Sequence, residues 1–139
     1  MQDIAEQIGR ATVEAVVADF YARVREHPQL SIPFARVKDW AAHEAHIAHF
    51  WWTSLGGERY READYRVGPK HADVGVTTPL MQHWLGLFRA TLDAHLPPDL
   101  AAPWFERALK IGESLLLLTQ FQQDAARQAR KQESHGADA

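Results

Sequence analysis

The chain has 139 residues, so we expect one domain rather than two. Its formal net charge is −3 and its basic residues are scattered, which argues against a nucleic-acid partner, because nucleic-acid-binding proteins concentrate positive charge on one surface. It contains no cysteine, which excludes disulfides, thiolate metal sites and cysteine nucleophiles.

The N-terminal stretch MQDIAEQIGR lacks the positive charge and the apolar run of a signal peptide. The longest apolar stretch of the chain, SLLLLTQF, is too short to span a bilayer. We therefore expect a cytoplasmic protein that does not bind membranes.

The first long helix is predicted over residues 11–27, where apolar side chains recur with a helical period and Pro28 follows. A short turn or a single helical turn, SIPFARV, is expected next. The apolar face of this helix comprises Val13, Val16, Val17, Phe20, Tyr21 and Val24.

The second helix is predicted over residues 39–54 and contains three histidines in the stretch DWAAHEAHIAHFWW. At about 100° per residue, His43 falls on the apolar face, His46 lies at its margin and His49 points roughly the opposite way. Three imidazoles at this spacing cannot converge on one metal ion from one straight helix. The segment alone favours a core role for His43, with a ligand pocket as the alternative. The apolar face comprises Trp40, His43, Ile47, Phe50, Trp51 and Ser54.

Residues 54–76 are rich in glycine and have no clear period, so we expect an excursion with at most short helices. Such long excursions in a compact domain are usually functional or mobile. A helix should follow from Thr78 to about His95, since proline at its second position suits a first turn. The sequence LPPDL breaks it, and a last helix is predicted over about residues 99–128.

No strand alternation or internal repeat is visible. We therefore predict an all-α fold with four substantial helices, a single domain over residues 1–128, and a polar, disordered tail over residues 129–139.

Four motifs follow one another along the chain: DFYARVR, WAAHEAHIAHFW, KH at residues 70–71 and HWLGLF at residues 83–88. In this order they resemble the truncated haemoglobins, specifically their third group. The resemblance covers about residues 9–125, and it is the order and spacing of the motifs that make it specific. It implies a two-over-two helical sandwich enclosing haem b. Gly68-Pro69 stands just before the third motif, so the proximal helix is expected to be short or irregular, because proline cannot donate a backbone hydrogen bond.

The resemblance implies a role for each candidate site residue. His71 would be the proximal iron ligand, the usual role of histidine in globins. Tyr21, His43 and Trp84 would be hydrogen-bond donors on the distal side, where they should slow the release of a bound diatomic ligand. Without the resemblance, Tyr21 and Trp84 would be predicted as core residues and His71 as a surface histidine. The expected apolar walls are Phe34, Ile47, Phe50, Trp51 and Phe88.

Two further side chains, Lys70 and His46, are candidates for contact with the haem propionates. His46 and His49 are otherwise expected at the surface or at the rim of the pocket. We expect a protein that binds dioxygen or another diatomic ligand for redox chemistry, such as nitric oxide dioxygenation or peroxide handling with a separate reductase. The alternatives are a gas-sensing module and a globin-like fold that has lost its haem.

Overall fold

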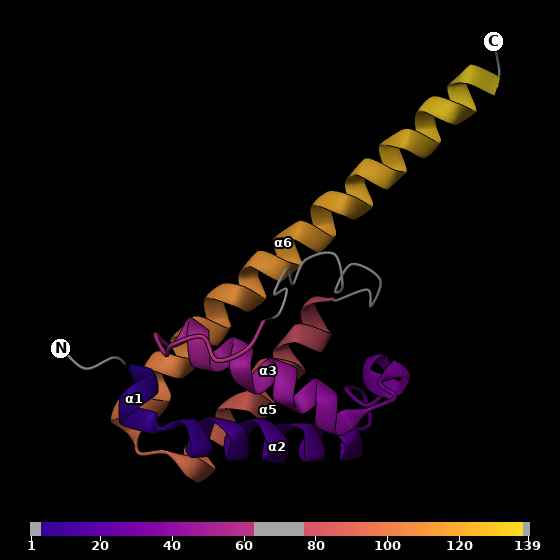
Figure 1. Ribbon diagram of the computed structural model, residues 1–139. Helices are drawn as coiled ribbons and strands as arrows, with labels where there is room; N and C mark the ends of the chain where they lie inside the picture. The colour runs from indigo at the N-terminus through magenta and orange to yellow at the C-terminus, as the bar shows by residue number, and fades with distance from the viewer. Residues whose placement is uncertain (1–3, 63–76, 138–139) are drawn as a thin grey trace.

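The computed structural model describes residues 4–62 and 77–137, with side chains as far as residue 132. Within these residues all regular structure is helical (Figure 1). No helix in this part of the chain is both long and apolar enough to cross a membrane. The elements are α1 (Ile4–Ile8), α2 (Arg10–Glu26), the 3₁₀ helix η1 (Pro33–Arg36), α3 (Trp40–Ser54), α5 (Thr78–His95) and α6 (Pro98–Ala137).

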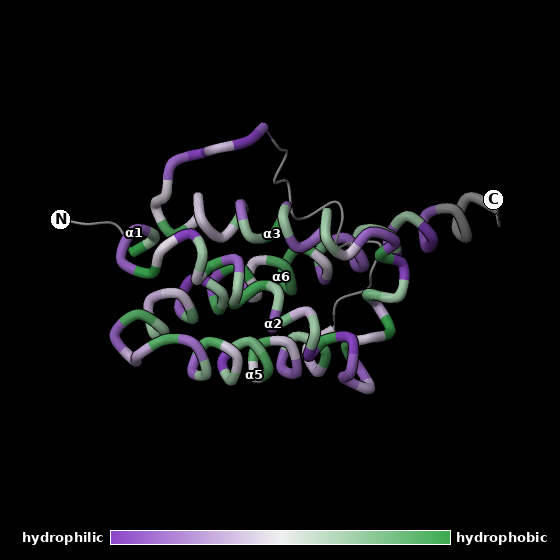
Figure 2. The backbone as a smooth tube through the Cα atoms, turned by 60° about the horizontal axis from the view of Figure 1, so that its bottom comes forward, coloured by the Kyte–Doolittle hydropathy of each residue, from purple (hydrophilic) through white to green (hydrophobic). Residues whose placement is uncertain are grey.

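The long helices pack as two pairs, α2 with α3 and α5 with α6, and α2 also packs on α5 to join the pairs (Figures 1 and 2). The short α1 contacts both α2 and α6. α5 and α6 approach closely at Gly112, where an added Cβ would lie 3.0 Å from the sulfur of Met81. The predicted all-α fold class is confirmed.

Local side-chain chemistry explains where the helices start. The Asp39 carboxylate accepts a hydrogen bond from the backbone N–H of Ala42 at 3.1 Å, which caps α3. The Thr77 hydroxyl accepts one from the backbone N–H of Leu80 at 3.3 Å and caps α5. Gly9 separates α1 from α2 with φ +91°, a left-handed conformation that favours glycine.

Two boundaries differ from the sequence prediction. The prediction did not contain α1, which has only five residues. The last helix continues to Ala137 rather than ending near residue 128, because its final turns are rich in alanine, glutamine, arginine and lysine, which favour helix. Most of the predicted excursion, with the short or irregular proximal helix, lies outside the described residues.

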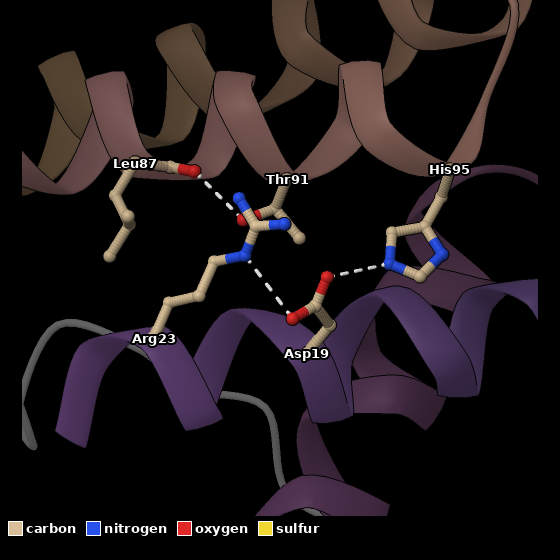
Figure 3. Close-up of polar contacts among 5 residues, drawn as sticks. All are labelled: Asp19, Arg23, Leu87, Thr91 and His95. Carbon is tan, nitrogen blue, oxygen red and sulfur yellow. Dashed lines mark hydrogen bonds and ion pairs between the residues drawn. The ribbon is translucent and has the colours of Figure 1, made fainter. Parts of the chain in front are cut away.

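A polar contact ties α2 to α5 at the edge of the core (Figure 3). The Asp19 carboxylate lies 2.7 Å from Nε2 of His95 and 3.2 Å from Nε of Arg23. Nearby, the buried hydroxyl of Thr91 donates to the carbonyl of Leu87 at 2.8 Å, so it is satisfied within its own helix. The Asp19–His95 contact thus supports the apolar packing of α2 on α5.

Candidate functional site

Tyr21, His43 and Phe34 meet although they come from three different elements. The Tyr21 ring is almost fully buried and lies edge-on to the His43 ring, with centroids 4.9 Å apart. The Phe34 ring from η1 is 5.6 Å from Tyr21 and 6.2 Å from His43. The Nε2 atom of His43 is buried. We call these three residues the distal cluster.

Trp40 packs against the distal cluster, although it was not among the predicted site residues. Its ring lies 5.7 Å from the rings of both Tyr21 and His43. The Arg25 guanidinium lies 4.6 Å from the Trp40 ring and forms an ion pair with Glu44 at 3.2 Å. The signal in the sequence was the position of Trp40 on the same helical face as His43, three residues earlier.

The electrostatic surroundings keep Tyr21 protonated. Burial raises the pKa of its phenol far above the ordinary value of 10.0, and the nearby Glu44 carboxylate adds to the rise. Tyr21 therefore keeps its hydroxyl proton at neutral pH and can donate a hydrogen bond.

A second group of predicted residues forms a stack of rings. Trp84 stacks on Phe88 at 5.0 Å with an interplanar angle of 16°, and Phe88 stacks on Trp51 at 5.5 Å and 21°. Phe20 joins this stack to the distal cluster, because its ring contacts Tyr21 at 5.2 Å and Trp84 at 5.1 Å. The sequence placed Phe20 in the core but did not indicate this bridging role.

The structure describes some of the remaining predicted site residues but not the predicted proximal ligand. Ile47 and Phe50 are partly buried and pack against the core from α3. His46 is partly buried on the same helix, and its contact with a haem propionate stays a prediction. His71 and Lys70 lie outside the described residues, so their roles as proximal ligand and propionate partner also stay predictions.

His49 is not at the surface or the pocket rim, so that prediction was wrong. Its side chain is fully buried, and its Nε2 accepts a hydrogen bond from the backbone N–H of Tyr60 at 3.1 Å. The Tyr60 ring lies edge-on to the imidazole at 4.2 Å, and the Arg10 guanidinium lies 3.4 Å from the centre of that ring. The chain after α3 folds back over His49, which a helical wheel of α3 alone does not reveal.

The described residues fit the distal side of a haem. The phenol of Tyr21, the imidazole of His43 and the indole of Trp84 are hydrogen-bond donors, and the residues between them are aromatic. Several apolar side chains around them pack against the core and are only partly buried. These partly buried side chains include Phe34, Trp40, Ile47, Phe50, Trp84 and Leu85.

The paired helices and the cluster between α2, η1 and α3 define a globin-like protein. The family model for bacterial-like globins matches residues 3–106, and the chain belongs to that family. A solved structure, the haemoglobin of the thermophilic phototrophic bacterium Chloroflexus aurantiacus, is similar with a TM-score of 0.74. The two are 25% identical, and the match covers 84% of this chain and 98% of that haemoglobin. None of the curated proteins matches this sequence.

Membership of the globin family indicates the general function of the chain. Globins bind haem, and through it they bind small diatomic ligands such as dioxygen. The helical fold of the described residues agrees with membership of this family.

Proposed function

We propose that this globin belongs to the third group of truncated haemoglobins and holds haem b through His71, with the distal cluster over the ligand side. The observation that carries the proposal is the contact between Tyr21 and His43 at 4.9 Å, beside Phe34. When bound, the haem supplies an iron that takes a diatomic ligand and exchanges electrons.

The chain's own part is to hold the ligand. Tyr21 donates through its hydroxyl, which its raised pKa keeps protonated. His43 offers an imidazole N–H from α3, and Trp84 offers an indole N–H from α5. Each net hydrogen bond is worth on the order of 1 kcal/mol, or about fivefold in affinity. Such a pocket favours retention of the ligand over easy release.

A pocket that retains its diatomic ligand suits redox chemistry on that ligand better than oxygen storage, which needs easy release. Nitric oxide dioxygenation and peroxide handling both use a ligand that stays in place while a second reactant or a proton arrives. For peroxide, His43 would act as the general base that moves a proton. Turnover needs electrons, so we propose that a separate cytoplasmic reductase supplies them.

Titration with haemin tests the haem site. We expect the absorption of wild-type protein to saturate at one haem per chain, and the His71→Ala variant to bind haem weakly or with an altered spectrum. The matched control is His83→Ala, which removes an exposed histidine of α5 and should leave the spectrum unchanged. A wild-type protein that takes up no haem would overturn the proposal, as would a His71→Ala variant identical to wild type.

Consumption of nitric oxide or peroxide by the loaded protein, with a reductase and NADH, tests the redox role. We expect turnover that the His43→Ala variant reduces. A protein that binds ligand tightly without turnover would instead point to gas sensing.

A further inference from the structure

α6 carries large apolar side chains on the face turned away from the other helices, which we call the globin body. Leu117 is 67% exposed and Phe121 is 72% exposed, whereas Thr119 between them is buried. Residues two apart on a helix differ by about 200° around its axis, so they lie on nearly opposite faces. Leu117 and Phe121 therefore point away from the body against which Thr119 packs.

The C-terminal part of α6, residues 113–137, forms what we call the arm. α6 has 40 residues, and both views show its end projecting from the other helices (Figures 1 and 2). Every residue from 120 to 132 is exposed. The match to the globin family ends at residue 106, before the arm. Helices in water draw most of their stability from packing of an apolar face, so an unaccompanied arm would be marginal.

An uncharged stripe runs along the outward face of the arm, with members three or four residues apart. Charged residues border it, with Glu113 near its start, Asp124 in the middle, and Arg127 and Lys131 near its end. Arg127 is paired with Asp124 at 2.9 Å, so Lys131 is the main basic partner for Glu113 of a second copy. The acidic and basic ends of the border lie on the same flank of the helix. The stripe consists of Ser114, Leu117, Phe121, Ala125, Gln128 and Gln132.

We propose that the arm is a dimerisation surface that pairs antiparallel with the arm of a second copy of this chain. With Phe121 near the twofold axis, Glu113 lies beside the turn of the second copy that holds Arg127 and Lys131. Opposite charges then face each other at both ends of the interface. The arrangement is isologous, so each copy contributes the same surface.

The pairing is independent of the haem site. α6 contacts α3 through Trp104, whose ring lies 5.9 Å from that of Trp51, and through Arg107, which donates to the carbonyl of Ser54. Both residues precede Glu113, so the proposed dimer surface lies apart from these contacts and from the distal cluster. Dimerisation therefore extends the proposed function without depending on it.

Sedimentation of the full chain tests the dimer. We expect the wild type to sediment as a dimer and Leu117→Lys/Phe121→Lys to sediment as a monomer. The control Gln123→Lys/Ala126→Lys adds the same charge at exposed positions off the stripe and should remain a dimer. Circular dichroism verifies that each variant is folded. A monomeric wild type would overturn the proposal, and so would a stripe variant that still dimerises.

Cysteine cross-linking tests the direction of the pair, because the chain has no cysteine of its own. In the antiparallel arrangement, Ser114 of one copy lies opposite Gln128 of the other. Ser114→Cys and Gln128→Cys should therefore form a disulfide-linked dimer when the two variants are mixed, and little when each is alone. Efficient cross-linking of each variant alone would contradict the antiparallel pair.

Reversal of charge gives an independent test. Glu113→Lys places like charges at both ends of the interface, so we expect the dimer dissociation constant to rise about tenfold. Adding Arg127→Glu/Lys131→Glu to that variant restores opposite charges and should restore dimerisation. A triple variant no tighter than Glu113→Lys would contradict the proposed register.

Discussion

The buried imidazole of His49 shows how one side chain holds the segment that follows α3. Its Nε2 accepts the backbone N–H of Tyr60, and the Tyr60 ring is held between the imidazole and Arg10. This contact fixes the described chain shortly before the stretch that contains His71. Without the imidazole, the Tyr60 amide would have to find another acceptor.

Substitution of His49 should destabilise the fold in a way that depends on the hydrogen bond. His49→Phe keeps an aromatic ring but removes the acceptor, and we expect it to lower the free energy of unfolding by about 1–3 kcal/mol. His49→Gln keeps an acceptor oxygen and should cost less. Urea denaturation measures both variants. Equal losses would show that the hydrogen bond contributes little.

The same residue predicts a pH dependence. Burial lowers the pKa of His49 below its ordinary value of 6.5, and the charges of Arg59, Arg61 and Arg10 lower it further, with a contribution from His46. The folded state thus binds a proton less readily than the unfolded state, so stability is complete above pH 6.5 and falls as the pH drops below it. The His49→Gln variant should lose this part of the pH dependence. An unchanged pH profile in that variant would contradict the assignment.

The sequence identified Tyr21 and His43 because both lie on the apolar face of a helix, a local property that periodicity detects. The burial of His49 depends on a contact with Tyr60, eleven residues away, and no local pattern encodes it. The bridging role of Phe20 was missed for the same reason, since it depends on how α2 meets α5.

At the scale of elements, α2 and α5 carry Tyr21 and Trp84, and the Asp19–His95 contact ties the two helices together (Figure 3). Partial burial opposes ionisation of Asp19. The hydrogen bonds and charges of His95 and Arg23 outweigh that effect and hold the pKa of Asp19 below its usual value of 3.8. The tie is therefore present above that pH and is lost as the pH falls through the lowered pKa.

Asp19→Asn should weaken this tie modestly. Because the pair is about one third exposed, we expect a loss of less than about 1 kcal/mol at pH 7. At pH values below the lowered pKa the variant and the wild type should converge. The control Glu106→Gln removes an exposed ion pair with Lys110 within α6 and should change nothing measurable. Urea denaturation at both pH values decides, and a difference that persists in acid would contradict the account.

The starts of the four long helices were predicted to within one residue, both where a side chain caps the helix, as Asp39 does for α3, and where none does, as at α2. The end of α6 was predicted about nine residues too early, because its last turns contain no glycine or proline that would stop the helix before residue 136. The polar composition of residues 129–139 suggested a disordered tail, whereas alanine, glutamine and arginine have a high intrinsic preference for helix.

At the scale of the whole molecule, the helical periods predicted an all-α fold, and the order of motifs predicted a globin. The relative placement of the two helix pairs could not be read from periodicity, since it depends on how α2 packs on α5, as at the rings of Phe20 and Trp84. We propose that this placement turns Tyr21 toward the ligand of a bound haem.

The rate of dioxygen release from the ferrous, haem-loaded protein tests whether Tyr21 donates a hydrogen bond to the bound ligand. We expect Tyr21→Phe to speed release about fivefold or more, because it removes a donated hydrogen bond worth about 1 kcal/mol. The matched control Tyr60→Phe removes a hydroxyl outside the distal cluster and should release dioxygen at the wild-type rate. If Tyr21→Phe also releases dioxygen at the wild-type rate, Tyr21 does not hold the ligand and the account of the distal cluster is wrong.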